Sequence, residues 1–195
     1  RIEKLKVGPY TAGDDIDYGP VVTEAAKRNI LGLVQSGVDQ GAELVVDGRD
    51  FTLQGYENGF FDRPHLFDRV TPDMNIYKKE IFGPVLSTVR AGSYEEAINL
   101  AIDHEYGNGT AIFTRDGDTA RDFANRINIG MVGINVPIPV PLAYHTFGGW
   151  KKSVFGDLNQ HGPDAFKFYT RTKTITSRWP SGIKEGGEFN FKAMD

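Results

Sequence analysis

The sequence has 195 residues, of which 39% are hydrophobic and 25% are charged, as is usual for a globular protein. The formal net charge of −4 disfavours a general nucleic-acid or anionic-membrane surface, since either would need clustered Lys and Arg. No apolar run approaches the roughly 18 residues of a membrane-spanning helix, and no signal peptide is recognisable. We therefore expect a soluble protein with neither a nucleic-acid nor a membrane partner.

Metal-ligating and thiol chemistry is not indicated by the residues present. The sequence contains no cysteine, which excludes disulfides, thiolate metal sites and cysteine nucleophiles from this chain. The four histidines do not have the spacing of zinc ligands, so each is expected on the surface or in a loop, and no metal site is predicted: His65, His104, His145 and His161. The first ten residues lack a starting Met and resemble the middle of a domain, which indicates a fragment.

The first predicted elements are a helix and two short strands. Residues 23–40 carry apolar side chains at helical spacing, Thr23 is a suitable N-cap, and Gly41 suits the left-handed residue that ends a helix. Residues 42–46 and 66–70 have the composition of short strands.

From residue 85 onward the pattern becomes regular. It predicts alternating strands and helices at 85–90, 93–105, 109–114, 117–128 and 131–135. Ser93 and Glu96 fit a capping box at the start of the first of these helices. This order favours a parallel α/β sheet with right-handed crossovers.

After residue 135 the alternation stops. Residues 136–163 are rich in Pro and Gly and predict a long, ordered loop of the kind that is usually functional. Within it, FGGWKKS (147–153) superficially resembles a phosphate loop, but the flanking strand and helix are missing, so a Gly-Gly turn with solvated lysines is the better interpretation. Residues 165–179 predict a strand.

The stretch KKEIFGPV (78–85) permits two interpretations. The Glu80 carboxylate can accept hydrogen bonds from vicinal ribose hydroxyls, as acidic residues do in dinucleotide sites. Phe82 could pack on a nicotinamide ring, and Gly83-Pro84 would fix the backbone between them. The alternative is a solvated surface glutamate beside a core aromatic residue, and spacing alone does not decide.

Four stretches in the same order resemble the aldehyde dehydrogenase superfamily. They are YGPVV…VVDGR (18–49), KEIFGPV (79–85), YGNGT…MVGIN (106–135) and TFGGWKKSVFGD (146–157). The similarity runs from Tyr18 to Trp179, and within the superfamily it is strongest to the branch that oxidises methylmalonate and malonate semialdehydes.

The resemblance implies a partial α/β, parallel-sheet, three-layer catalytic domain. Residues 1–169 are then the carboxy-terminal part of that domain, 170–179 an oligomerisation strand and 180–195 a tail. It also implies NAD as the cofactor, coenzyme A as co-substrate, and a homodimer or homotetramer in the bacterial cytoplasm or the mitochondrial matrix.

Site residues are carried over by the same resemblance. Glu80 matches the family's ribose-binding glutamate, Phe82 its nicotinamide contact and Phe147 a phenylalanine of the substrate pocket. Asn29 stands where many relatives offer a Lys to the cofactor ribose, so cofactor contacts from that helix are not assigned.

The family's reaction needs a cysteine thiolate, which this chain lacks. The thiolate adds to the aldehyde, and the thioester left after hydride transfer is attacked by coenzyme A. We therefore assign no catalytic residue and expect the chain alone to be inactive. Two alternatives remain open: a non-acylating branch of the superfamily, and a catalytically silent module that serves assembly.

Overall fold

The structure is a computed structural model that describes residues 1–179, so the tail predicted at 180–195 lies outside the described residues. The α-helices are α1 (Glu24–Asp39), α2 (Asn75–Lys78), α3 (Tyr94–Asp103), α4 (Gly117–Arg126) and α5 (Ala165–Tyr169). The strands are β1 (Glu43–Val46), β2 (His65–Asp68), β3 (Val85–Ser87), β4 (Tyr106–Gly107), β5 (Gly109–Ile112), β6 (Met131–Ile134) and β7 (Trp150–Lys151). Short 3₁₀ helices span Ile2–Lys4, Tyr10–Ala12 and Gly162–Asp164.

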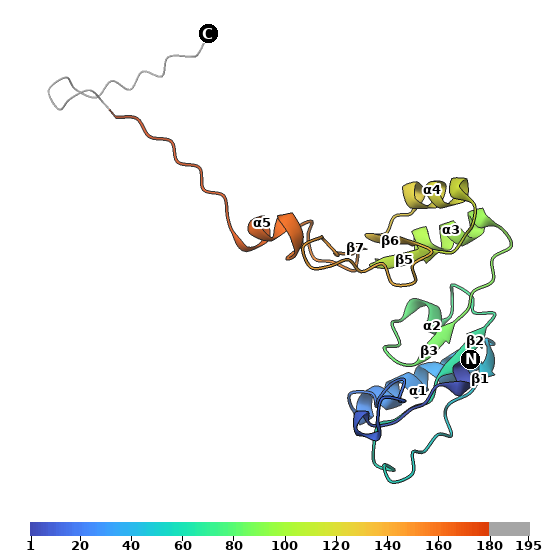
Figure 1. Cartoon of the computed structure of the whole chain (residues 1–195). Coiled ribbons are helices and arrows are strands. Elements are labelled where there is room, and N and C mark those ends of the chain that lie inside the picture. Colours follow the sequence, from blue (N-terminus) through green and yellow to red (C-terminus); the bar gives the residue numbers. More distant parts are fainter. Residues whose placement is uncertain (180–195) are drawn as a thin grey trace.

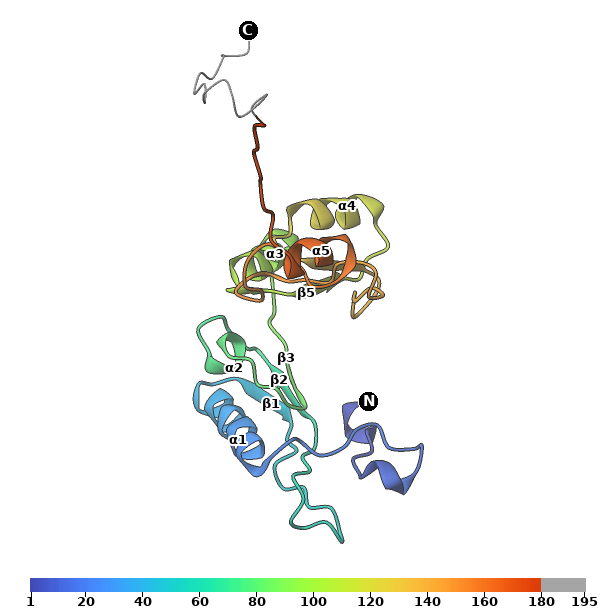
Figure 2. The same ribbon diagram turned by 90° about the vertical axis from the view of Figure 1, so that its left-hand side faces the viewer.

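The elements form two α/β lobes joined by residues 88–93 (Figure 1). The first lobe (residues 1–87) contains α1, α2 and β1–β3, and the second lobe (residues 94–153) contains α3, α4 and β4–β7 (Figure 2). Both views place the lobes one above the other, so any site that draws on both lobes lies where they face each other.

The first lobe is built by packing α1 and α2 against a three-stranded sheet. α1 starts at Thr23, whose Oγ1 accepts the Ala26 N–H at 3.1 Å, and is followed by Gly41 at φ 92°, so both predicted helix ends are confirmed. Its apolar face meets the sheet and α2 in a core of Ile30, Leu33, Val34, Ala42, Phe67, Val70, Met74 and Ile76.

The expectation of one parallel sheet is only partly confirmed. β2 and β3 are parallel, with His65 opposite Val85, but β1 runs antiparallel to β2 and has an irregularity between Leu44 and Val46. The antiparallel pairing was not predicted, because strand composition does not encode strand direction.

The second lobe confirms the predicted strand–helix–strand unit. β5 and β6 pair in parallel, and Ile98, Phe123, Ile127 and Ile129 form the core beneath α3 and α4. Ser93 Oγ accepts the Glu96 N–H at 3.1 Å. The Glu96 carboxylate accepts the Gly92 N–H at 2.7 Å, whereas a capping box would have it accept the N–H of Ser93, one residue later. Within residues 1–179 the strands belong to three separate sheets, so the single continuous sheet that we expected is not formed by this part of the chain.

The predicted long loop contains one unexpected pairing. β7 (Trp150–Lys151) lies within it and pairs antiparallel with β4 (Tyr106–Gly107) at the end of α3. The middle of the loop is therefore attached to the second lobe.

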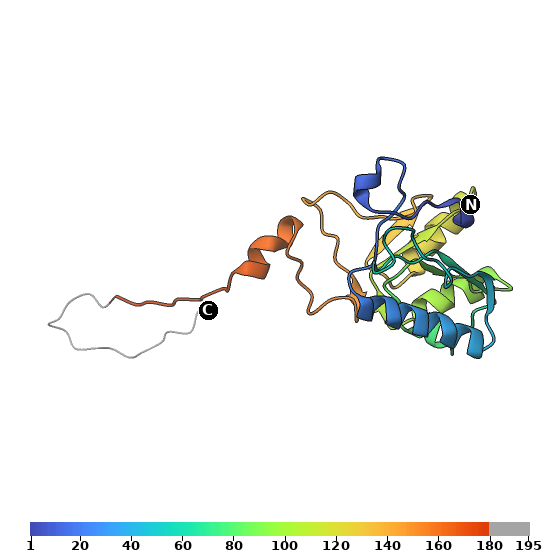
Figure 3. The same cartoon turned by 90° about the horizontal axis from the view of Figure 1, so that it is seen from below.

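The predicted strand at 165–179 is wrong over its first five residues, which form α5. Residues 170–179 are exposed and belong to neither a helix nor a strand, and Figure 3 shows α5 and this segment extending away from the lobes. The proposed pairing of 170–179 with a partner subunit stays a prediction.

One histidine lies far from the predicted surface position. His65 is fully buried beside buried Asp62, with Nε2 3.2 Å from an Asp62 carboxylate oxygen. His65 Nδ1 accepts the Gly48 N–H at 3.2 Å, so Nε2 carries the proton and donates to Asp62. The pair satisfies two buried polar groups and joins β2 to the loop before it.

None of the helices in residues 1–179 is both long and apolar enough to span a membrane.

Candidate functional site

The turn between α2 and β3 presents Glu80 and Phe82 on its outer side. Ile81, between them, is half-buried and packs on the first lobe's core. Glu80 and Phe82 are exposed outside that core, and Phe82 is 79% exposed. The anchoring of Ile81 in the core thus leaves a carboxylate and an aromatic ring exposed on either side of it.

The backbone of this turn is tightly constrained. Phe82 has φ 58°, a left-handed conformation that is unfavourable for a bulky residue and is often found at functional sites. Gly83 approaches α1 so closely that a Cβ there would lie 2.5 Å from Ile30 Cδ1. The Pro84 carbonyl accepts the His65 N–H at 2.8 Å. These contacts hold the turn in one position against buried parts of the lobe.

Glu80 lines a cavity of about 510 Å³ between the two lobes. In the described residues, no hydrogen bond or ion pair ends on its carboxylate, so both oxygens are available to a ligand. The first lobe contributes Tyr77, Lys78, Lys79 and Glu80 to this cavity, and the second lobe contributes His104, Tyr106, Asn108, Lys152 and Ser153. The cavity therefore exists only while the lobes keep their relative position.

Phe147 lines a second, smaller cavity of about 310 Å³. Its ring stacks on the His161 ring with 4.4 Å between centroids and 21° between planes. The two cavities share Asn108 and Ser153 in their linings, so they are neighbours. The structure thus brings the surroundings of Glu80 and Phe147 together, although the two residues are far apart in sequence.

Phe82 and Asn29 are placed differently from Glu80. The Phe82 ring lines neither of these two cavities, and it stands out from the turn that carries it. Asn29 is exposed on α1. The predicted cofactor roles of these residues are not tested by the contacts within this chain.

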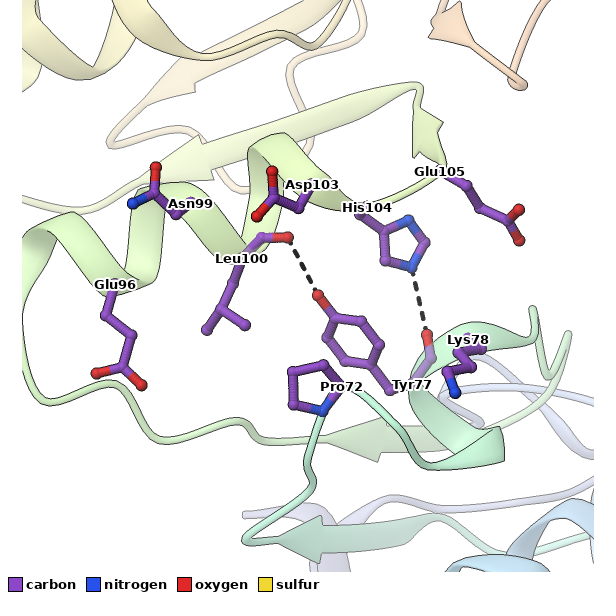
Figure 4. A pocket seen from close by; sticks show the side chains of 9 residues that line it. All are labelled: Pro72, Tyr77, Lys78, Glu96, Asn99, Leu100, Asp103, His104 and Glu105. Atoms are coloured by element: carbon purple, nitrogen blue, oxygen red, sulfur yellow. Dashed lines mark hydrogen bonds between the residues drawn. The ribbon is translucent and has the colours of Figure 1, made fainter.

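His104 joins the lobes next to the Glu80 cavity (Figure 4). Tyr77, on α2, donates from its hydroxyl to the Leu100 carbonyl at 3.1 Å, and His104 Nε2 lies 3.3 Å from the Tyr77 carbonyl. His104 Nδ1 accepts the Tyr106 N–H at 3.1 Å, which places the ring proton on Nε2 and makes it the donor to Tyr77. Burial raises the pKa of the Tyr77 hydroxyl, so this group remains protonated and keeps donating at neutral pH.

A third cavity, of about 610 Å³, shares Tyr77, Lys78 and His104 with the lining of the Glu80 cavity (Figure 4). Three carboxylates and Lys78 are among its linings, and the carboxylates are those of Glu96, Asp103 and Glu105. It includes none of the predicted site residues.

The interpretation of the FGGWKKS lysines as solvated is wrong for Lys151 and holds for Lys152, whose side chain is exposed although it is ion-paired. Lys151 Nζ donates to the carbonyls of Ala101, Ile102 and His104 at 3.2, 2.7 and 3.0 Å. Lys152 forms an ion pair with Glu105, which raises the pKa of the lysine and lowers that of the carboxyl group. Sequence reasoning missed these roles because the partners lie almost fifty residues away; no local pattern marks them.

The chain belongs to the aldehyde dehydrogenase family, whose model matches residues 1–175. A malonate-semialdehyde dehydrogenase of Pseudomonas aeruginosa is 58% identical over the whole chain, and an acylating, mitochondrial methylmalonate-semialdehyde dehydrogenase of Arabidopsis thaliana is 49% identical over 91% of it. A protein of Sinorhizobium meliloti, named as a candidate methylmalonate-semialdehyde dehydrogenase and solved with NAD, shares 72% identity over 94% of the chain with a TM-score of 0.86.

These relatives are much longer than the chain described here. The chain spans 39% of the P. aeruginosa protein, 30% of the A. thaliana protein and 37% of the S. meliloti structure. The position of the chain within the longer proteins stays a prediction.

Proposed function

We propose that this chain is part of an NAD-dependent, coenzyme A-acylating methylmalonate/malonate-semialdehyde dehydrogenase, and that it forms the carboxy-terminal portion of the catalytic domain. The observation that carries the proposal is the turn at Glu80–Pro84, which offers to the cavity between the lobes a carboxylate that has no partner among residues 1–179. The relatives' names and the NAD complex of a relative support the same reaction.

The residues present fit one wall of a nicotinamide-dinucleotide site. The Glu80 oxygens, which no other group in the described part of the chain occupies, can accept two hydrogen bonds from vicinal ribose hydroxyls, and the exposed Phe82 ring can pack on the nicotinamide. NAD, when bound, supplies the hydride acceptor. In this role Glu80 orients the cofactor, and Phe82 excludes water from one side of its ring.

The Phe147 cavity is the proposed place of the aldehyde. Its stacked aromatic pair, Phe147 and His161, gives it an apolar wall, and Asn108 connects it with the cavity of Glu80. A substrate held there would lie beside a cofactor held by Glu80, which is the proximity that hydride transfer needs.

The thiolate nucleophile of the proposed reaction is not supplied by this chain, since the sequence has no cysteine. We therefore propose that residues 1–195 alone do not oxidise an aldehyde. The relatives include bacterial and mitochondrial proteins, so either compartment fits the proposal. Assembly into a dimer or tetramer through residues 170–179 is part of the same proposal and is supported by the exposure of that segment.

The test is an assay of the complete gene product with malonate and methylmalonate semialdehydes. We expect NAD reduction together with formation of an acyl-coenzyme A thioester, and no NAD reduction by residues 1–195 alone. Full turnover without coenzyme A would favour a non-acylating branch. A natural gene product of only these 195 residues, unable to oxidise either aldehyde, would favour the silent assembly module.

A further inference from the structure

We propose that Lys151 is a positioning residue, which fastens the Phe147 loop (residues 147–153) to the C-terminal end of α3 and so fixes the wall of the proposed aldehyde cavity. The inference rests on the proposed function, because it takes the cavity beside Phe147 as the aldehyde site. It adds a role for a side chain that lines neither that cavity nor the cavity of Glu80.

The ammonium group of Lys151 replaces hydrogen bonds that the end of a helix lacks. The last carbonyls of an α-helix have no partner within the helix, and they carry the negative end of its dipole. The Ala101 and Ile102 carbonyls belong to this last turn of α3, and the His104 carbonyl follows directly after it. Three carbonyls thus converge on one cation, and hydrogen bonds from an ionised donor are stronger than those between neutral groups.

The backbone around Lys151 is shaped to bring its side chain to α3. Lys151 has φ 54° and pairs with Tyr106 across the β4–β7 ladder. Its aliphatic stem passes over Gly107, where an added Cβ would lie 3.2 Å from Lys151 Cδ. A left-handed lysine that crosses a glycine is an unfavourable local arrangement, so it is maintained by the bonds that the ammonium group makes.

The other contacts of the loop lead to the same place. The Lys152 N–H donates to the Glu105 carbonyl at 3.2 Å, and Ser153 Oγ accepts the Gly107 N–H at 3.0 Å. Gly149 lies so close to the second lobe that a Cβ there would come within 3.0 Å of Asn108 Cα. Because Asn108 and Ser153 line both cavities, a shift of this loop moves a wall of each.

The experiment compares Lys151→Met and Lys151→Arg in the complete enzyme, with Lys4→Met at an exposed lysine of the first lobe as the matched control. Methionine keeps most of the stem but cannot donate, whereas arginine keeps charge and donors. Two readouts are measured: amide hydrogen exchange in residues 104–110 and 147–155, and the KM and kcat for semialdehyde. For Lys151→Met we expect exchange in both segments to be about tenfold faster and KM about tenfold higher, with kcat within about twofold.

The split between KM and kcat separates positioning from mere loss of folded enzyme, because inactive molecules lower the apparent kcat but leave KM unchanged. The inference is supported if the KM of Lys151→Arg lies between those of wild type and Lys151→Met, and if Lys4→Met has the amide exchange, KM and kcat of wild type. Unchanged exchange in both segments, or a lower kcat at unchanged KM, overturns it. If Lys151→Met does not fold, Lys151→Gln takes its place in both measurements.

Failure of the proposed function gives a different result. A complete wild-type protein that oxidises neither semialdehyde would refute that function. The exchange comparison between Lys151→Met and wild type would then still decide whether Lys151 fastens the loop.

Discussion

Replacing Glu80 by Gln in the complete enzyme tests whether this carboxylate receives the cofactor's ribose hydroxyls. Its oxygens have no hydrogen-bond or ion-pair partner among residues 1–179, so the change breaks no contact within this part of the chain. Glutamine is almost the same size and keeps one acceptor oxygen. The loss therefore comes from the weaker bonds to the ligand, about 1–3 kcal/mol, which corresponds to roughly 5- to 150-fold weaker NAD binding.

The assay is calorimetric titration of NAD into the complete wild-type enzyme and its variants, so it does not depend on turnover. Glu80→Asp keeps the charge but shortens the side chain, and we expect its NAD affinity to lie between those of wild type and Glu80→Gln. Glu3→Gln alters an exposed glutamate at the start of the first lobe and should leave NAD binding unchanged. Equal NAD affinity in Glu80→Gln, Glu3→Gln and wild type would refute the ribose assignment.

Two further changes test the fold that carries the turn. Gly83→Ala forces a methyl group to 2.5 Å from Ile30 Cδ1, so we expect the free energy of unfolding, measured by chemical denaturation, to fall by about 1–3 kcal/mol. Ile30→Val removes the Cδ1 methyl group, so the double variant should recover part of the loss. A double variant whose loss equals the sum of the two single losses would argue against the clash. Two hydrogen bonds from Arg90 lower the pKa of Asp68 to about 2. The stability that this pair contributes is thus present above about pH 3.9, the ordinary value for Asp, and is lost as the pH falls through the folded-state value. Arg90→Met should raise the Asp68 pKa toward its ordinary value in a carboxyl NMR titration, and an unchanged pKa would contradict this cause.

The elements with a capping residue and a clear apolar period were predictable. α1 and α3 begin where Thr23 and Ser93 predicted, because a side-chain oxygen that satisfies an early helix N–H is a local signal. The parallel pairing of β5 with β6 followed from the strand–helix–strand order.

The elements that sequence reasoning missed are short or depend on distant partners. α5 has five residues, too few to distinguish a period of 2 from one of 3.6, and its aromatic side chains favoured a strand. β4 and β7 have two residues each, and the pairing partners Tyr106 and Lys151 lie far apart in the sequence. The burial of His65 is likewise a tertiary effect, since it requires Asp62 as a partner.

The candidate site was only partly readable from the sequence. Glu80 could be proposed from the resemblance to the family, and its exposure in the structure follows from the anchoring of Ile81. The joining of its cavity to that of Phe147 could not be predicted, because Asn108 becomes shared only when the two lobes are packed together.

The two hydrogen bonds between Tyr77 and the end of α3 have a consequence for ligand affinity. They link the lobe that bears Glu80 to the lobe that bears Asn108, and each has a net value of only about 1 kcal/mol. In residues 1–179 both lobes line the cavity of Glu80, so only molecules in which the lobes keep this arrangement present the whole binding surface. The apparent dissociation constant is the intrinsic one divided by the fraction of molecules in which the lobes face each other, so Tyr77 would help to set ligand affinity by holding the lobes together as well as by lining the cavity.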